Sequence, residues 1–132
     1  MNRQEMIDLA KQIRSDEERP QVTPPPEQAR QFNAMYIARA EDAYHHLASP
    51  LYAAQLDALP QTLVLTAELD SLAQEARQYA NRLQETGVAV EHQEFAGQPH
   101  AFTHHGDANV ALQAWQRIAD FLRHVFQSAK RS

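Results

Sequence analysis

Two residues suited to proton transfer, Asp70 and His100, each follow a stretch that is predicted to form a β-strand. An aspartate that accepts a hydrogen bond from one imidazole nitrogen fixes the tautomer of the ring. It also stabilises the imidazolium that forms when the other nitrogen takes a proton. Histidine suits this role because its charge changes near neutral pH. The two residues therefore predict an acid–base pair in which Asp70 orients His100.

The two strands predict where this pair lies. Residues 62–67 are almost all apolar or β-branched, as in a strand covered on both faces, whereas residues 88–95 mix apolar and charged side chains, as in an edge strand. A helix between them makes a βαβ unit with parallel strands. Functional residues of open α/β sheets lie outside the carboxyl ends of the strands. We therefore expect Asp70 and His100 at one edge of the sheet, with a carboxylate oxygen about 2.7–3.2 Å from His100 Nδ1.

The helix that joins the strands has recognisable ends. Its apolar residues repeat at helical spacing over residues 72–83. Ser71 and Gln74 have the spacing of a capping box, and Gly87 supplies a stop.

Two further helical patterns flank this unit. The first runs over residues 27–47 and is interpreted as a helix that packs on the core through a wide aromatic side. Its apolar residues are Ala29, Phe32, Tyr36, Ala40, Ala43, Tyr44 and Leu47. The second begins near Asp107, and its Trp115 is interpreted as a core anchor.

The chain is divided near its proline run. Residues 1–26 predict a short amphipathic helix through Met6, Leu9, Ala10 and Ile13, followed by a stiff proline-rich linker. Residues 27–132 hold the α/β pattern and form the second unit.

Composition limits the possible functions. The 132 residues suit a single domain, and the net charge of −5 argues against nucleic-acid binding. Cysteine is absent, which excludes disulfides and thiol chemistry. No signal peptide and no membrane-spanning apolar run is found, so the expected location is the cytoplasm.

A set of motifs in order along the chain resembles the carboxyl-terminal part of α/β-hydrolase esterases and lipases of the hormone-sensitive-lipase type. These motifs are Ser49-Pro50-Leu51, Asp70 after a strand, and His100-Ala101-Phe102 after the next strand, and the resemblance covers about residues 32–126. It implies a truncated α/β-hydrolase fold with the last two parallel strands and flanking helices. It also implies that Asp70 is the acid and His100 the base of a catalytic triad that hydrolyses carboxylic esters. Two departures are Ala101, where the family usually has Gly, and Ser71, where Pro is common.

The other half of that machinery is absent from these 132 residues. The nucleophile of this fold lies in Gly-x-Ser-x-Gly, with oxyanion donors from a Gly-rich loop. The chain has only three glycines, and none lies two residues from a serine. We therefore expect the chain alone to be inactive on esters, and a small ester to be its substrate only if a serine-bearing half is supplied. The alternative is a non-catalytic interaction or regulatory module that retains part of the hydrolase fold.

Ligands and partners complete the expectations. His100, His104, His105 and Asp107 form a loop cluster that is interpreted as exposed histidines rather than a metal site, so no metal and no cofactor is predicted. An apolar strand with an uncovered edge favours a homo-oligomer, formed through residues 62–67 or through an aromatic face of Phe32, Tyr36 and Tyr44. The alternative is a monomer in which residues 1–13 fold over that edge.

Overall fold

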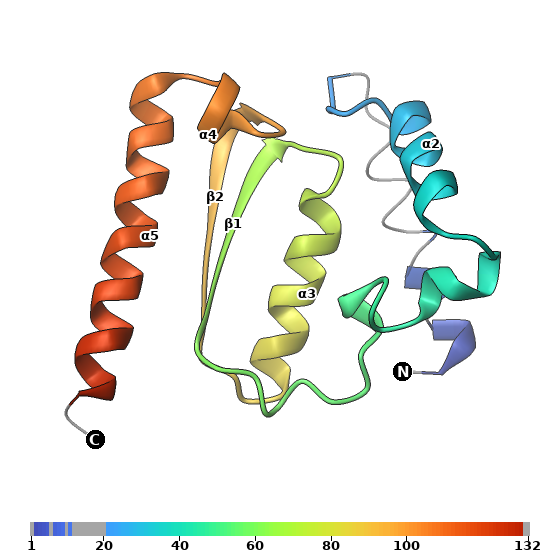
Figure 1. Ribbon diagram of the computed structural model, residues 1–132, viewed down its shortest axis with the longest axis horizontal. Helices are drawn as coiled ribbons and strands as arrows, with labels where there is room; N and C mark the ends of the chain where they lie inside the picture. Colours follow the sequence, from blue (N-terminus) through green and yellow to red (C-terminus); the bar gives the residue numbers. More distant parts are fainter. Residues whose placement is uncertain (1, 6, 10, 12–20, 131–132) are drawn as a thin grey trace.

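The architecture has three layers, with a two-stranded parallel sheet between helices on its two faces (Figure 1). A computed structural model describes residues 2–5, 7–9, 11 and 21–130. The sheet consists of β1 (Thr62–Leu69) and β2 (Val90–Pro99), joined by α3 (Ala73–Glu85). Helix α3 covers one face and the last helix, α5 (Ala108–Ala129), covers the other. This confirms the predicted α/β class with two parallel strands and flanking helices.

Each face of the sheet is sealed by its own apolar cluster. On the α5 side, Ala67 of β1 and Phe95 of β2 pack with Phe102 and Ala114. Near the carboxyl end of α3, a second cluster joins Leu83 to Leu56 and to Val88, which lies two residues before β2. Each cluster contains few buried side chains, because a sheet of two strands has little surface on which helices can pack. The core therefore lies close around the βαβ unit.

The pairing of the strands changes register near their carboxyl ends. Thr62 to Ala67 pair in sequence with Val90 to Phe95, but Leu69 then pairs with Pro99. Between these pairs β1 advances by two residues while β2 advances by four. Two additional residues of β2 thus bulge out, a local irregularity that redirects the chain. Asp70 and His100 follow the Leu69–Pro99 pair directly, so the bulge is what brings them opposite each other.

The ends of α3 differ in part from the prediction. The expected capping box of Ser71 and Gln74 is wrong, because Leu72 is the N-cap residue and no side chain caps the helix. Instead, the Asp70 carboxylate accepts a hydrogen bond from the Leu72 backbone N–H at 2.8 Å. The predicted stop is confirmed, since Gly87 has φ of 88°, a conformation that favours glycine.

The predicted helix over residues 27–47 is also wrong in its length and its burial. Helix α2 spans only Pro26–Tyr36 and buries no residue, and its side chains Phe32 and Tyr36 are 53% and 74% exposed. The backbone is extended at Ile37, which is β-branched and a weak helix former. Among the described residues the aromatic side of α2 stays largely exposed, so little tertiary contact supports a longer helix. Two short 3₁₀ helices follow, η1 (Ala40–Tyr44) and η2 (Pro50–Tyr52).

The last helix begins as predicted, but a different side of it faces the sheet. The Asp107 carboxylate caps α5 by accepting from the N–H groups of Asn109 and Val110. Trp115 is 48% exposed and is not the core anchor that was expected. Val110 and Ala114, the latter directly before Trp115 in the sequence, contact the core instead. A short helix, α4 (Phe102–His105), lies before α5.

Parts of the amino-terminal prediction lie outside the described residues. Residues 3–5, 7–9 and 11 are helical, but Met6, Ala10 and the segment 12–20 are not described. Within the described residues, no helix is both long enough and apolar enough to cross a membrane.

Candidate active site

The candidate site is built on Asp70, at the turn that follows β1. Its backbone N–H donates to Ala67 and its carbonyl accepts from Ala73, so the main chain is held on both sides. One carboxylate oxygen, Oδ1, accepts from the Leu72 N–H, which fixes the side chain in its turn. The other, Oδ2, remains for a second partner. Because only 17% of this side chain is exposed, the carboxylate is partly shielded from water.

That second partner is His100, as the strand ends predicted. His100 Nδ1 lies 2.9 Å from Asp70 Oδ2, within the distance range expected for the pair. The tautomer with the proton on Nδ1 donates to Asp70 and leaves Nε2 as the basic nitrogen. The imidazole is 45% exposed, so a reacting group has access to it. The geometry is that of an oriented base and the acid that orients it.

A third residue, Thr23, ties the two strand ends together from outside the βαβ unit. Its backbone N–H donates to the Leu69 carbonyl at 2.9 Å, and its own carbonyl accepts from Ser71 at 3.0 Å. These bonds make a short parallel bridge to Asp70 on the free edge of β1. The Thr23 hydroxyl also accepts from the His100 backbone N–H at 3.1 Å. Thr23 therefore positions both members of the pair.

Nothing in the sequence around Thr23 signals this contact. It lies among prolines, in a segment predicted to be a linker, and 77 residues separate it from His100. Periodicity and motif spacing describe neighbours along the chain, and this contact is set by tertiary structure alone.

The turn after His100 has an unusual backbone. Ala101 has φ of 57° and ψ of 28°, in the left-handed region where glycine is favoured. The backbone conformation, rather than the size of the side chain, thus explains why glycine is usual at this position in the family. The alanine here carries backbone strain beside the candidate base.

The neighbouring histidines do not join the pair. His104 contacts Thr103 through its ring nitrogen at 2.9 Å and lies edge-on to Trp115. Across the residues that the structure describes, no group of three or more His, Cys, Asp or Glu side chains is arranged to hold a metal ion.

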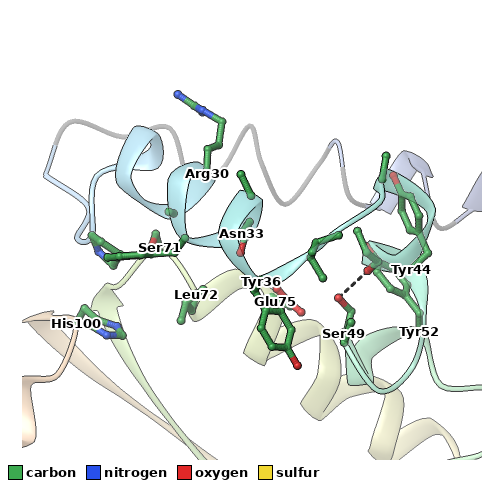
Figure 2. A pocket seen from close by; sticks show the side chains of 18 residues that line it. Arg30, Asn33, Tyr36, Tyr44, Ser49, Tyr52, Ser71, Leu72, Glu75 and His100 are labelled. Carbon is green, nitrogen blue, oxygen red and sulfur yellow. Dashed lines mark hydrogen bonds between the residues drawn. The ribbon is translucent and has the colours of Figure 1, made fainter.

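A cavity of about 690 Å³ opens beside His100. It lies between α2, the chain that follows this helix, and the start of α3 (Figure 2). Small apolar residues make up much of its lining, together with the aromatic side chains of Phe32, Tyr36, Tyr44 and Tyr52. Figure 2 shows His100 at one end of the cavity and Tyr44 and Tyr52 at the other. A bound molecule that fills the cavity would thus extend away from the imidazole.

Glu75 lies in this cavity, between its two ends (Figure 2). Burial raises the pKa of its carboxyl above the ordinary value, because the charged form loses water there. The sequence did not single out Glu75 or the cavity. The only feature of the sequence that could have pointed to Glu75 is its place in the first turn of the helix that follows Asp70.

Known proteins share this fold and this order of elements. The alpha/beta hydrolase fold family matches residues 5–104. An arylesterase of Saccharolobus solfataricus is 39% identical over 93 residues, which is 70% of this chain and 30% of that protein. A thermostable carboxylesterase cloned from a metagenomic library superimposes with a TM-score of 0.76 at 31% identity, over 85% of this chain and 38% of the other. A hyperthermophilic esterase of the archaeon Pyrobaculum calidifontis gives the same TM-score at 29% identity, over 86% and 37%.

This chain therefore spans about a third of the length of these relatives. The match includes the βαβ unit and reaches back through the proline-rich segment. By sequence and by structure, the chain belongs to the alpha/beta hydrolase fold family and is an esterase-like part of that fold.

Proposed function

We propose that this chain supplies the acid and the base of a carboxylic-ester hydrolase, Asp70 as the orienting acid and His100 as the general base. The observation that carries the proposal is the 2.9 Å contact between His100 Nδ1 and Asp70 Oδ2, at the carboxyl ends of paired parallel strands. His100 Nε2 would take the proton from a serine hydroxyl and later return it to the leaving alcohol. The relatives that are named as esterases support the choice of reaction.

The serine and the oxyanion donors must come from residues other than these 132, since no Gly-x-Ser-x-Gly is present. The free edge of β1 is the place where such a part would pair. Among the described residues only Thr23 bridges to that edge, and it does so in parallel at the carboxyl end of the strand. A strand of the serine-bearing part that pairs in parallel with the free edge of β1 and ends near Thr23 would extend the parallel sheet, as the α/β-hydrolase fold requires.

A chimera tests this proposal directly. The serine-bearing part of the thermostable carboxylesterase would be joined to this chain in place of the region that superimposes on it. The expected result is a folded chimera that hydrolyses p-nitrophenyl esters with saturation kinetics and is labelled by a serine-directed phosphonate. The chain alone should give neither signal. A cooperatively melting chimera that is neither labelled by the phosphonate nor able to turn over esters would refute the assigned roles.

Self-association is a second property supported by specific surfaces. Apart from Thr23, the described residues leave one edge of β1 unpaired, and α2 presents an exposed aromatic side. Bare strand edges and contiguous apolar surface are usually covered in natural proteins. A homo-oligomer formed through residues 62–67 or through Phe32, Tyr36 and Tyr44 would cover them. This association is the form that the interaction-module alternative would take.

A further inference from the structure

The cavity beside His100 holds a carboxylate that has no partner. Glu75 lies in the first turn of α3 and is half-buried against the cavity. Within the described part of the chain, no hydrogen bond or ion pair reaches its side chain, and burial alone accounts for its shifted pKa. It is also the one acidic side chain among the described residues that line the cavity. A half-buried carboxylate without a counter-charge is costly, so a ligand that supplies positive charge would bind favourably there.

A second unmatched polar group lies four residues earlier. Ser71 is 2% exposed, and within the described part of the chain its buried hydroxyl oxygen has no hydrogen-bond partner. The same residue lines the cavity, next to the Asp70 turn and near His100 (Figure 2). Buried hydroxyl groups are normally hydrogen-bonded, and one that lines a cavity without a partner marks a contact for a ligand.

The remaining walls suit a cation rather than an anion. Phe32, Tyr36, Tyr44 and Tyr52 are among the residues that line the cavity, and the faces of aromatic rings attract positive charge. The only fixed cation among the described lining residues is Arg30, and its side chain extends away from Glu75 (Figure 2).

We propose that this cavity binds a small organic ammonium ion with an aryl or alkyl group. The ammonium would donate one N–H to the Glu75 carboxylate and a second to the Ser71 hydroxyl, because a primary ammonium has three donors. The organic group would pack among the tyrosine rings. If the proposed ester hydrolysis is correct, the cavity would serve as a substrate subsite that selects amine-bearing esters; this part of the inference rests on the proposed function. The binding of an ammonium ion by the chain does not depend on catalysis.

Three ligands of similar shape and different charge test the site. Benzylammonium, benzyl alcohol and benzoate would be titrated into the ¹⁵N-labelled chain at neutral pH, with backbone amide shifts around Leu72 and Glu75 as the readout. Benzylammonium should bind at least about tenfold more tightly than benzyl alcohol, from the ion pair and the aromatic faces together. Benzoate should bind most weakly. Because no ester is present, this result does not depend on the catalytic proposal.

Variants separate the charge from the shape of the cavity. Glu75→Gln should abolish the preference for benzylammonium while benzyl alcohol binds as before. Glu85→Gln, on the same helix but exposed and outside the cavity, should keep the preference. Ser71→Ala should weaken benzylammonium about fivefold through the lost hydrogen bond. Dispersed amide spectra would confirm that each variant is folded.

Several outcomes would overturn the proposal. They are equal affinity for the three ligands, tighter binding of benzoate, no amide shifts around the cavity at millimolar benzylammonium, or a preference that survives Glu75→Gln. Failure of the esterase chimera with intact ammonium binding would instead remove the catalytic proposal and leave the binding site.

Discussion

At the scale of single residues, the candidate site depends on backbone conformation as much as on its two side chains. Ala101 and Gly97 both have positive φ, at 57° and 67°; Gly97 lies within the register change of β2 and Ala101 directly follows His100. Glycine adopts this region freely, whereas an alanine there costs roughly 1–2 kcal/mol. The chain thus has a glycine at one of these positions and a strained alanine at the other.

This contrast predicts opposite effects of two reciprocal substitutions. Ala101→Gly should raise the free energy of unfolding by about 1 kcal/mol, and Gly97→Ala should lower it by about 1 kcal/mol. A methyl group at Gly97 would meet no atom within 4 Å, so its effect should come from the backbone alone. Urea unfolding of the two variants and the parent measures both changes. Effects of the same sign would contradict the assigned conformations.

Thr23 carries the second residue-scale prediction. Thr23→Val keeps the shape of the side chain but removes the oxygen that accepts from the His100 backbone N–H. The unfolding free energy should fall by about 1 kcal/mol, because a partly buried donor loses its partner. In the active chimera, kcat should also fall while KM changes little, since His100 is less well positioned. An unchanged kcat in a folded variant would show that Thr23 has no positioning role.

Glu75 predicts a pH dependence of stability. Its carboxyl has a raised pKa in the folded chain, so the stability it contributes is fully present below its ordinary value of 4.5 and is lost as pH rises through the raised value. Glu75→Gln removes this loss. The variant should therefore gain stability over the parent as pH increases from 4 to 7, and the two should converge at acid pH. Urea unfolding across that range measures the difference, and a difference that shrinks with rising pH would be inconsistent with burial of the carboxyl.

At the scale of elements, the sequence predicts what local patterns control and fails where tertiary contacts decide. Strong periodicity identified α3 and α5, a nearly continuous apolar and β-branched run located β1, and a mix of apolar and charged residues located β2. The glycine stop and the start of the last helix near Asp107 are local signals and were correct. The Asp70–His100 contact was predictable because parallel strands bring their carboxyl ends to one edge.

The errors have a shared physical cause. The helix predicted over residues 27–47 ends at Tyr36, and among the described residues its aromatic side stays largely exposed. Trp115 was expected in the core for its size, but the two-stranded sheet is too narrow to cover that side of α5. The two-residue insertion in β2 leaves no mark on the apolar pattern, although it sets the site. Burial depends on which partners are present, and a pattern of side chains does not contain that information.

At the scale of the whole molecule, too much apolar surface remains uncovered for an isolated chain. The exposed large apolar side chains of the described residues include Met35 and Tyr36 on α2 and Phe126 on α5. Together with the open edge of β1, these surfaces favour association.

We therefore predict that the isolated chain forms a dimer or a higher oligomer at micromolar concentration. Light scattering coupled to size exclusion should give a mass at least twice the 15.0 kDa of one chain. Tyr36→Glu, which places charge on the aromatic side of α2, should shift the chain toward monomer if that side forms the interface. Ser132→Glu is a charge-matched control far along the sequence and should not. A mass near one chain at all concentrations would rule the oligomer out.

The most direct test of the central claim compares histidine and aspartate variants in the esterase chimera. His100→Ala and Asp70→Asn should each lower kcat/KM on the order of a thousand- to ten-thousand-fold, because the serine then lacks an oriented base. His104→Ala changes a histidine of helix α4, four residues away and in contact with Thr103, and should leave kcat/KM within about twofold. If His100→Ala and His104→Ala lowered the rate equally, or if neither lowered it, the pair built by the ends of β1 and β2 would not be the acid and base of the reaction.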